Sequence, residues 1–468
     1  EVPLRHRDLI EIGAKRYFHQ GIENRHSVFN LFFRKAPFKG GYAIASGLAD
    51  AIKFLSSFRV TDDDVQFLST LRGNDNSSLF DDAFLDAIRG RTLELDIDAM
   101  PEGTVAFANE PLMRVSGPLW QAQWVETALL CIINFQTLIA TKAARVCEMA
   151  GEDAVLEFGL RRAQGTNGGL TASRAAFIGG CAATSNVWAA QAFGIPCKGT
   201  HAHSWIMSFD DELTAFSAYA DAMPNNCVFL VDTYNSIEGI KNAITVGLAL
   251  REKGFEVVGI RLDSGDLAAL SIEARNMLDE AGFPEAAIVA SNDLDEHKIQ
   301  ELKQMGSKIN VWGVGTNLVT AEDQPALGGV YKLAVIENGT GDLVDRIKLS
   351  DDPTKSSIPG IQQVQRTWVD GQWSHDVIYD PREPQTTKGE QDVDDATTVT
   401  RDLLVPFMRR GQLVGTLPTL PQVRDRAIKN RKQLPSEMRG LSCGLTGRVS
   451  LSDSLQKRRA AMVQNGKE

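Results

Sequence analysis

The sequence lacks a surplus of basic residues. It carries 49 Lys and Arg against 60 Asp and Glu, a formal net charge of −11. Because nucleic-acid binding depends on basic side chains that neutralise phosphates, this balance argues against DNA or RNA as the partner. A small anionic ligand remains compatible with it, since a few local arginines can hold one.

The sequence also lacks metal-type cysteine spacing and long apolar runs. Its six cysteines include no CxxC pair, and Cys131, Cys147 and Cys227 lie in apolar stretches, which predicts buried thiols in a reducing compartment. No uninterrupted run of about 18 apolar residues occurs, and no charged segment followed by an apolar one opens the chain. We therefore expect a cytoplasmic protein without a membrane partner.

A chain of 468 residues, 43% of them hydrophobic, is long enough for more than one domain. From about residue 152, short apolar runs such as "VFLVDTY", "EVVGIRLDSGD" and "KINVWGVGTN" alternate with helical stretches. Strand, polar turn and helix in repetition are typical of a parallel sheet covered by helices. Because the strands show no polar face, we expect an irregular β/α barrel.

The flanking regions predict a second domain that is discontinuous in sequence. We expect an N-terminal α/β domain at 1–125, the barrel at 126–345, and C-terminal loops and helices at 346–468 that return to the first domain. An uncharged apolar helix is expected from about Leu119 to Ala150. The region 350–400 is expected to form long loops with short strands, and "LPQVRDRAIKNRKQLPSEMRGL" a helix.

Polar residues follow the predicted strands repeatedly, at the end that leads into the next helix. In barrels of this type, ligands bind at the carboxyl ends of the strands. These positions are Arg161 and Arg162, His203, Asp232, Arg261 with Asp263 and Asp266, Ser291 with Asn292, and Gly313, Gly315 and Thr316. The recurrence predicts one active site at this end of the sheet.

Some of these residues also fit ordinary structural roles. Gly313 and Gly315 either mark a tight turn or, with Thr316, free backbone N–H groups and a hydroxyl to bind a phosphate. The stretch from Asp263 to Asp266 is either a helix N-cap or a set of carboxylates for ribose hydroxyls and Mg²⁺. The residues alone leave both alternatives open.

Two histidines, His201 and His203, stand two positions apart in "CKGTHAHSWIMSF". A zinc site would require more His, Cys or carboxylate ligands at set spacing, and no HExxH pattern is present. Each histidine is therefore either a nucleophile or a packed, hydrogen-bonded side chain. No metal ligand is assigned.

Five segments together resemble the nicotinate phosphoribosyltransferases. They are "FFRKAPFKGGYAIASGL", "EFGLRRAQGTNGGLTASRAAFIGG", "GTHAHSW", "IRLDSGDL" and "VGTNLVTAEDQPALGGVYKL". The later "KLSDDPTKSSIPGIQQVQR" belongs to the same pattern, and together these segments cover most of residues 28–440 in family order. The resemblance implies a homodimeric enzyme with shared active sites. It implies synthesis of nicotinate mononucleotide and pyrophosphate from nicotinate and phosphoribosyl pyrophosphate, coupled to ATP hydrolysis with Mg²⁺.

The resemblance also implies individual roles. The family motif G-T-x-A-H places the phosphorylated histidine at His203 and a variable residue at His201, and catalysis would further involve Asp263 and Asp232. Nicotinate would bind to Phe158, Arg161, Thr200 and Arg261, and the phosphoribosyl group to Ser291, Asn292, Gly313, Gly315 and Thr316.

One position departs from the family pattern: Ile10 stands where family members carry a Tyr that stacks on nicotinate in the partner subunit. Two alternatives therefore accompany the assignment. One is a nicotinamide phosphoribosyltransferase, although that family has an Asp where this chain has Ser185. The other is a non-catalytic relative, which only the altered N-terminus supports.

Overall fold

A computed structural model describes residues 13–350, 356–383, 397–443 and 447–465 of the chain, so Ile10 lies outside the described residues. The chain forms two compact units. Unit 1 comprises Glu1–Leu138 with Ala326–Glu468, and unit 2 comprises Ile139–Pro325. The domain boundaries expected from the sequence, at 125/126 and 345/346, remain predictions. The units themselves divide at 138/139, inside a long helix, and at 325/326.

Unit 2 is built on a six-stranded sheet in the order β7-β6-β11-β10-β9-β8, with every neighbouring pair parallel. The strands are β6 (Ala154–Glu157), β7 (Ala183–Thr184), β8 (Val228–Leu230), β9 (Gly259–Leu262), β10 (Ala287–Ala290) and β11 (Val311–Val314). Every residue of unit 2 is described, and β7 and β8 form no ladder with each other. The predicted irregular β/α barrel is confirmed, and its irregularity is the missing ladder between β7 and β8.

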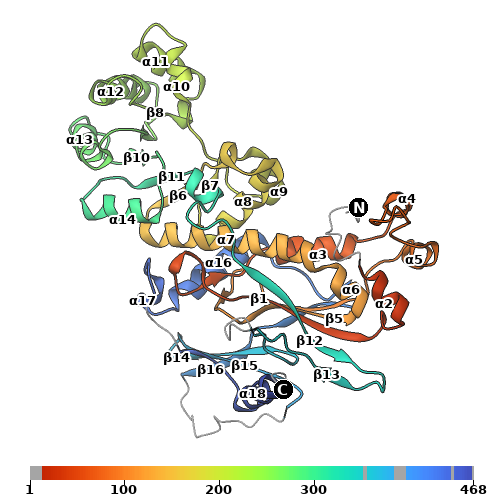
Figure 1. The fold of residues 1–468 in the computed structure, drawn as a ribbon. Coiled ribbons are helices and arrows are strands. Elements are labelled where there is room, and N and C mark those ends of the chain that lie inside the picture. The colour runs from red at the N-terminus through yellow and green to blue at the C-terminus, as the bar shows by residue number, and fades with distance from the viewer. Residues whose placement is uncertain (1–12, 351–355, 384–396, 444–446, 466–468) are drawn as a thin grey trace. The chain divides into compact units, whose positions relative to one another are not determined.

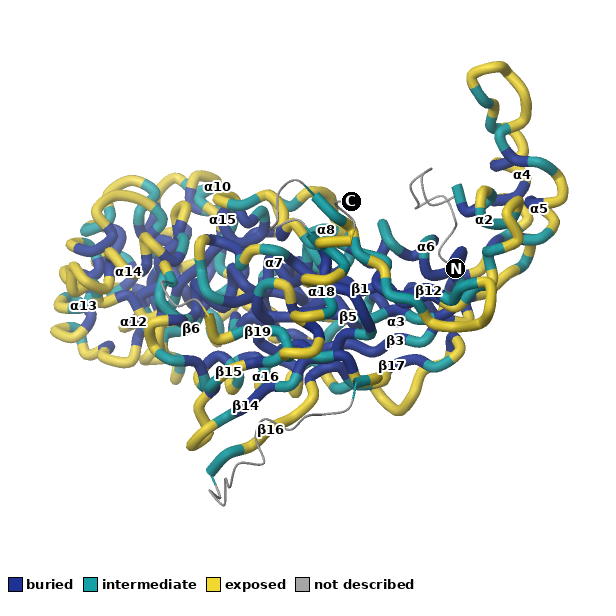
Figure 2. The backbone as a smooth tube through the Cα atoms, turned by 60° about the horizontal axis from the view of Figure 1, so that its bottom comes forward, coloured by how far each residue is buried: buried dark blue, intermediate teal, exposed yellow. Residues whose placement is uncertain are grey.

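Helices connect consecutive strands and lie outside them, as α12, α13 and α14 do in Figure 1. Figure 2 shows their solvent faces as yellow against the buried interior. The helical elements of unit 2 are η3 (Leu160–Arg162), α8 (Gly165–Gly179), α9 (Val187–Phe193), α10 (His203–Met207), α11 (Glu212–Ala222), η4 (Pro224–Asn226), α12 (Ser236–Glu252), α13 (Leu267–Glu280), α14 (Glu296–Gln304) and α15 (Thr316–Val319). One predicted strand, "IPCKGT", forms only a single bridge, between Cys197 and Thr184.

Unit 1 contains a seven-stranded antiparallel sheet in the order β13-β12-β1-β5-β3-β17-β18. The strands are β1 (His26–Phe33), β3 (Asp96–Ala99), β5 (Pro111–Pro118), β12 (Gly329–Glu337), β13 (Leu343–Asp345), β17 (Val405–Arg409) and β18 (Gln412–Leu413). Ser27 pairs with Ile336 on one side and with Gly117 on the other. Segments beyond residue 325 therefore complete the N-terminal domain. Completion by C-terminal segments was predicted, but as loops and helices from 346 onward, whereas β12, β13, β17 and β18 do so as strands.

Two smaller sheets accompany it: β2 (Ala43–Ile44) with β4 (Val105–Ala106), and β16 (Thr398–Asp402), β14 (Gln363–Val369), β15 (Gln372–Tyr379) and β19 (Val449–Leu451) in the order β16-β14-β15-β19. The region 350–400 was expected to form long loops with short strands, and its strands β14 and β15 form a hairpin. Its turn, Asp370-Gly371, has positive φ at both residues. Asp-Gly favours this turn.

The helical elements of unit 1 are α2 (Lys15–Gln20), η2 (Pro37–Lys39), α3 (Leu48–Ser57), α4 (Asp62–Thr70), α5 (Asp82–Ile88), α6 (Leu119–Trp124), α16 (Leu420–Lys432), α17 (Ser436–Arg439) and α18 (Asp453–Asn465). The predicted C-terminal helix is thus α16 followed by α17. Arg426 of α16 donates to the carbonyl of Glu102 at 2.9 Å, which ties the C-terminal segment to the N-terminal one.

The apolar helix predicted over 119–150 is broken at Val125 into α6 and α7 (Glu126–Ala150). By length and composition α7 could cross a membrane, but 61% of its most apolar window is buried within the protein, a pattern that a core helix produces. Cys147 on this helix is buried as expected. Cys131 is exposed, so its predicted burial is wrong, because it lies on the outer face of the helix.

A buried ion cluster fixes the β14–β15 hairpin in unit 1. The Arg366 guanidinium donates to both oxygens of Asp376 and to the carbonyl of Val105. Glu110 lies 3.7 Å from the same guanidinium. Burial, followed by the nearby charge of Asp376, raises the pKa of Glu110 well above its usual value. One arginine thus links the hairpin to the segment around β4.

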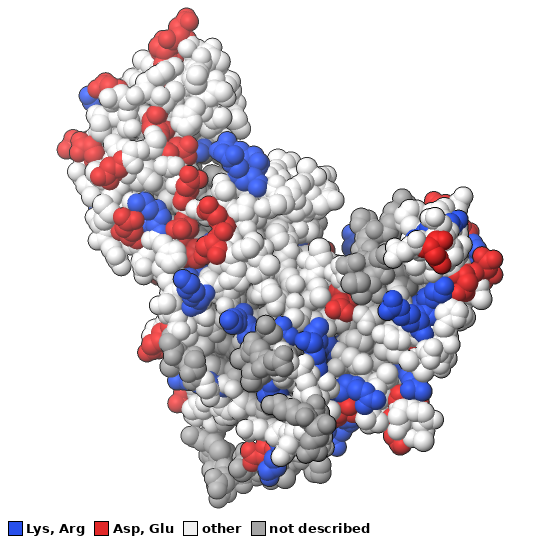
Figure 3. Space-filling model, viewed as in Figure 1, with Lys and Arg blue, Asp and Glu red and all other residues white. Residues whose placement is uncertain are grey.

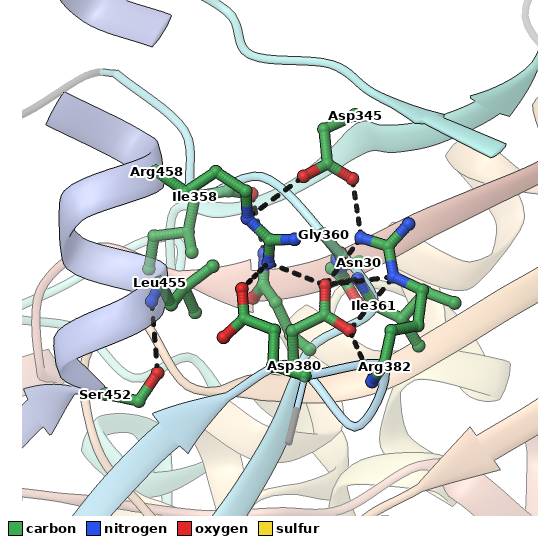
Figure 4. Close-up of polar contacts among 12 residues, drawn as sticks. Asn30, Asp345, Ile358, Gly360, Ile361, Asp380, Arg382, Ser452, Leu455 and Arg458 are labelled. Carbon is green, nitrogen blue, oxygen red and sulfur yellow. Dashed lines mark hydrogen bonds and ion pairs between the residues drawn. The ribbon is translucent and has the colours of Figure 1, made fainter. Parts of the chain in front are cut away.

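A second cluster anchors the C-terminal helix α18, as Figure 4 shows. Arg458 on this helix contacts Asp380 at 2.7 Å and Asp345 at 3.2 Å, and Arg382 contacts the same two carboxylates. The hydrogen bonds from Arg382 and Arg458 lower the pKa of Asp380 despite its burial. Leu455, fully buried, adds apolar packing to the helix.

Candidate active site

The carboxyl ends of the parallel strands bring the polar residues predicted from sequence into one region of unit 2. The neighbouring strands β6, β11, β10, β9 and β8 end immediately before Phe158, Gly315, Ser291, Asp263 and Val231, respectively. Because parallel strands share one direction, their ends meet at one edge of the sheet. The spatial convergence inferred from the sequence is therefore present in the fold.

Arg261, on β9, is the centre of a hydrogen-bond network. Its guanidinium donates to the hydroxyl of Thr200 at 2.9 Å, to the hydroxyl of Ser291 at 2.8 Å and to the carboxylate of Asp263 at 2.9 Å. Ser291 also donates to Asp263. The guanidinium lies 6.0 Å from the centroid of the Phe158 ring. Three predicted binding residues and the predicted catalytic Asp263 thus lie around one arginine.

Asp232 joins this network to His203. Its Oδ2 accepts hydrogen bonds from the backbone N–H of Asp263 at 2.9 Å and from the hydroxyl of Ser264 at 2.6 Å. Its Oδ1 lies 3.3 Å from Nε2 of His203. The Asp232 side chain is 1% exposed, whereas that of His203, at the start of α10, is 40% exposed. A buried carboxylate therefore orients an accessible imidazole.

His201 has a different environment from His203. It is buried, its ring packs edge-on against Tyr219, and Nε2 accepts the backbone N–H of Leu230 at 3.2 Å. Burial lowers the pKa of His201 to about 4, and the nearby charges of Arg261 and His203 act in the same direction. His201 is therefore a neutral, packed histidine, one of the two alternatives that the sequence left open.

An open pocket of about 580 Å³ adjoins this network within unit 2. This volume is in the range of small-molecule sites. Its lining residues come from the loop after β6, the start of α8 and the end of β7: Phe158, Leu160, Arg161, Ala163, Gly165, Thr166 and Ser185. The pocket thus combines an aromatic ring, a cation and a neutral hydroxyl.

Packing restricts the first glycine of "WGVGTN". A Cβ on Gly313 would lie 2.8 Å from the Phe158 ring, whereas one on Gly315 would make an ordinary contact with the Phe158 backbone at 3.4 Å. The N–H of Phe158 donates to the carbonyl of Val314 at 2.8 Å. Thr316 begins the short helix α15. The glycine-containing turn and the loop carrying Phe158 are therefore in direct contact.

The structure separates the two roles that the sequence allowed for 263–266. Asp266 is the N-cap of α13, accepting the N–H of Ala269 at 3.0 Å. Asp263 does not cap the helix, and its carboxylate instead forms an ion pair with Arg261. Asn292, predicted to lie near the phosphate, is exposed, has a positive φ of 99° and lines a separate surface pocket with Asp293 and His297.

Sequence reasoning missed two residues of the site. Ser264 donates to Asp232, and only its position in "LDSGD" suggested it. Glu157, the last residue of β6, accepts three hydrogen bonds beneath the pocket loop. A glutamate in an otherwise apolar strand was the available signal for it.

Acidic side chains gather over α12, α13 and α14 on the face shown in Figure 3. Among the described residues, Glu296, His297 and Asp323 come close enough together to hold a metal ion. The carboxylate of Glu296, however, pairs with Lys142 at 2.7 Å and Arg145 at 2.8 Å. These two cations already neutralise it, so we assign no metal to this group.

Comparison with known proteins identifies the family. A model of the nicotinate phosphoribosyltransferase (NAPRTase) N-terminal domain matches residues 12–134, and a model of the nicotinate phosphoribosyltransferase (NAPRTase) family matches residues 154–359. The chain is 49% identical to nicotinate phosphoribosyltransferase of Bacillus subtilis (strain 168), over 77% of this chain and 72% of that protein. It is 36% identical to nicotinate phosphoribosyltransferase of Homo sapiens, over 95% and 93%.

Solved structures lead to the same family. The crystal structure of human nicotinic acid phosphoribosyltransferase matches with a TM-score of 0.83 and 34% identity, covering 97% of this chain and 99% of that one. Nicotinate-nucleotide pyrophosphorylase from Pyrococcus furiosus, at 21% identity and a TM-score of 0.71, shares the fold. The chain belongs to the nicotinate phosphoribosyltransferase family, which is consistent with NAD salvage.

Proposed function

We propose that the protein forms nicotinate mononucleotide and pyrophosphate from nicotinate and phosphoribosyl pyrophosphate, coupled to hydrolysis of ATP. One observation carries the proposal: Arg261, Asp263, Asp232 and His203 form a continuous network beside the pocket of Phe158 and Arg161. The names of the relatives point to the same substrate.

Nicotinate is a flat aromatic ring with a carboxylate, and the pocket has groups for both parts. The Phe158 ring stacks on the pyridine, and Arg161 holds the carboxylate, with Arg261 and Thr200 beside it. An arginine suits this task because its planar N–H groups match the two oxygens of a carboxylate. Stacking contributes roughly 0.5–1.5 kcal/mol beyond area burial.

The sugar step requires little proton transfer. The pyridine nitrogen attacks C1 of the ribose as pyrophosphate leaves, and positive charge develops on the sugar. The carboxylates of Asp263 and Asp232 stabilise that charge electrostatically. Carboxylate oxygens are also the ligands that Mg²⁺ prefers, so these two residues fit a hydrated Mg²⁺, which would neutralise the departing pyrophosphate. The backbone at Gly313 and Gly315, with Thr316 and Ser291, binds the 5-phosphate.

His203 couples the reaction to ATP. An ionised Asp232 accepts hydrogen bonds only, so it fixes the proton on Nε2 of His203 and leaves a lone pair on Nδ1. Nδ1 forms a bond to the γ-phosphorus while the bond from that phosphorus to the ADP oxygen breaks. Water later cleaves the N–P bond and releases phosphate. Phosphohistidine is a high-energy species that can drive the synthesis.

The test combines product and label assays. We expect wild-type protein to form nicotinate mononucleotide faster with ATP, and γ-labelled ATP to leave an acid-labile label on His203. His203→Ala should lose the label and the ATP stimulation but retain slow transfer. His375→Ala, at an exposed histidine of unit 1, is the matched control. ATP stimulation retained in full by His203→Ala would refute the coupling role.

The second candidate is transfer to nicotinamide, which fits the same pocket. Ser185 favours nicotinate, because a neutral hydroxyl at the pocket wall does not repel a carboxylate. Competition between the two pyridines in one product assay decides the substrate, and faster use of nicotinamide would overturn our choice. Absence of any product with either pyridine would instead support the non-catalytic alternative.

We also propose that a second copy of the chain covers the pocket region in a cytoplasmic homodimer. Val187 and Trp188 open α9 close to Ser185, which lines the pocket, and they are 70% and 47% exposed. Large apolar side chains grouped beside a site are typical of an interface. Light scattering should give twice the chain mass, and Trp188→Glu should shift it toward the monomer.

A further inference from the structure

We propose that Glu157 is a positioning residue that fixes the geometry of the nicotinate-binding loop, residues 158–162. The inference rests on the proposed function, because it concerns how Phe158 and Arg161 are held in place for the pyridine. Glu157 is the last residue of β6 and is 1% exposed, so it cannot itself be a surface ligand.

The Glu157 carboxylate accepts hydrogen bonds from three neutral donors. Oε1 accepts the backbone N–H of Gly159, and Oε2 accepts the hydroxyls of Ser173 at 2.8 Å and Thr184 at 2.6 Å. Within unit 2, all of which is described, it forms no ion pair. A buried carboxylate without a cation is costly unless hydrogen bonds compensate for its lost hydration. We therefore infer that the role of the Glu157 carboxylate is to form these three hydrogen bonds.

The three donors belong to the three elements that build the pocket. Gly159 lies between Phe158 and the η3 turn that carries Arg161. Ser173 is on α8, whose first residues line the pocket, and Thr184 directly precedes Ser185. Thr184 also accepts the N–H of Asn186, the N-cap of α9. One carboxylate thus ties together the loop, the helix and the opposite wall.

The loop is confined on its other side as well. A Cβ at Gly159 would lie 2.5 Å from Val319 and 2.9 Å from the carbonyl of Gly315. The backbone at Gly159 is therefore in close contact with α15 and with the glycine-containing turn before it. Phe158 is bonded through its N–H to Val314. The main chain at Gly159 is held between this contact and the carboxylate, and loss of either frees the ring and the arginine together.

The chemistry explains why a glutamine cannot replace the glutamate. A carboxylate offers an acceptor oxygen to the Gly159 N–H and a second to both hydroxyls. A glutamine amide has one oxygen and one NH₂ group. If the oxygen faces Gly159, the NH₂ group meets Ser173 and Thr184. The Ser173 hydroxyl can then donate to the carbonyl of Gly169 at 2.9 Å, but the Thr184 hydroxyl loses its carboxylate acceptor. Glu157→Gln therefore keeps the volume and disturbs the bonding.

The experiment measures KM for each substrate and the melting temperature of the full-length protein. We expect Glu157→Gln to raise the nicotinate KM about 10-fold with the phosphoribosyl pyrophosphate KM within about twofold of wild type. Thr184→Val keeps the shape but removes the hydroxyl that donates to Glu157 and accepts from Asn186, and it should raise the nicotinate KM about threefold. Glu157→Ala should exceed both, and if it fails to fold, the other two variants carry the test.

Glu296→Gln is the matched control, because Glu296 is an equally buried carboxylate in unit 2 that pairs with Lys142 and Arg145. It should lower the melting temperature without changing the KM for nicotinate relative to that for the other substrate. The inference is overturned if the Glu157 variants also lower only the melting temperature, or raise both KM values equally. If the wild-type protein forms no nicotinate mononucleotide, the proposed function fails instead.

Discussion

The neutral state of His201 predicts a specific dependence of stability on pH. Nε2 of His201 accepts the N–H of Leu230, so a proton on Nε2 would face a donor in a buried position. The pKa of His201 is about 4 in the folded protein, against 6.5 for an unperturbed histidine. Between these values the unfolded chain binds more protons than the folded one, so stability falls as pH falls.

The size of the effect follows from the two pKa values. They differ by about 2.5, and each pKa unit corresponds to about 1.4 kcal/mol, so protonation costs the folded state about 3 kcal/mol when complete. The loss begins near pH 6.5 and is fully expressed at about pH 4. Above pH 6.5 His201 contributes no pH dependence.

His201→Phe isolates this contribution. The variant keeps the aromatic contact with Tyr219 but leaves the Leu230 N–H without an acceptor, so we expect it to be about 1–3 kcal/mol less stable at pH 7. Urea unfolding at several pH values between 7 and 4 should show this gap closing or reversing. His375→Phe, at an exposed site, is the control. Parallel pH profiles for wild type and His201→Phe would refute the reasoning.

Two further substitutions test the pocket and the core. Gly313→Ala would place a Cβ 2.8 Å from the Phe158 ring, so the ring must move. In a kinetic assay the nicotinate KM should rise about 10-fold. Gly168→Ala is the control, because a Cβ there meets open space and should leave the KM unchanged. Arg366→Met leaves the Asp376 carboxylate buried without its cation, so it should lower the free energy of unfolding by about 3–5 kcal/mol. Adding Asp376→Asn removes the uncompensated charge. Recovery of stability in the double variant would confirm the cause.

The sequence alone could predict the barrel and the position of the site. Strand and helix alternate there at short range, and the polar turns after β8, β9 and β11 contain Asp232, Asp263 and Thr316 at the ends where parallel strands deliver ligands. Local pattern decides this kind of structure, because each strand is defined by its own apolar run.

The contacts that join distant segments could not be predicted in this way. Arg261 and Thr200 are 61 positions apart, and no periodicity indicates that they form a hydrogen bond. The Arg366–Asp376 pair is a cross-strand contact that depends on the register of a hairpin whose Asp-Gly turn signal was overlooked. The break between α6 and α7 at Val125 could not be predicted either, because no proline or glycine stands near it in "LWQAQWVETALL".

The pairing of β1 with β12 has a consequence for synthesis. Ser27 and Ile336 are far apart in the chain, so at roughly 5–20 residues per second the apolar strand "SVFNLFF" is synthesised about 15–60 s before β12, one of its two neighbours. The barrel, whose strands are contiguous in the chain, is translated entirely within that interval. During that interval β1 has β5 as its neighbour on one side, through pairs such as Ser27 with Gly117, while its other edge stays without the partner strand that completes the sheet.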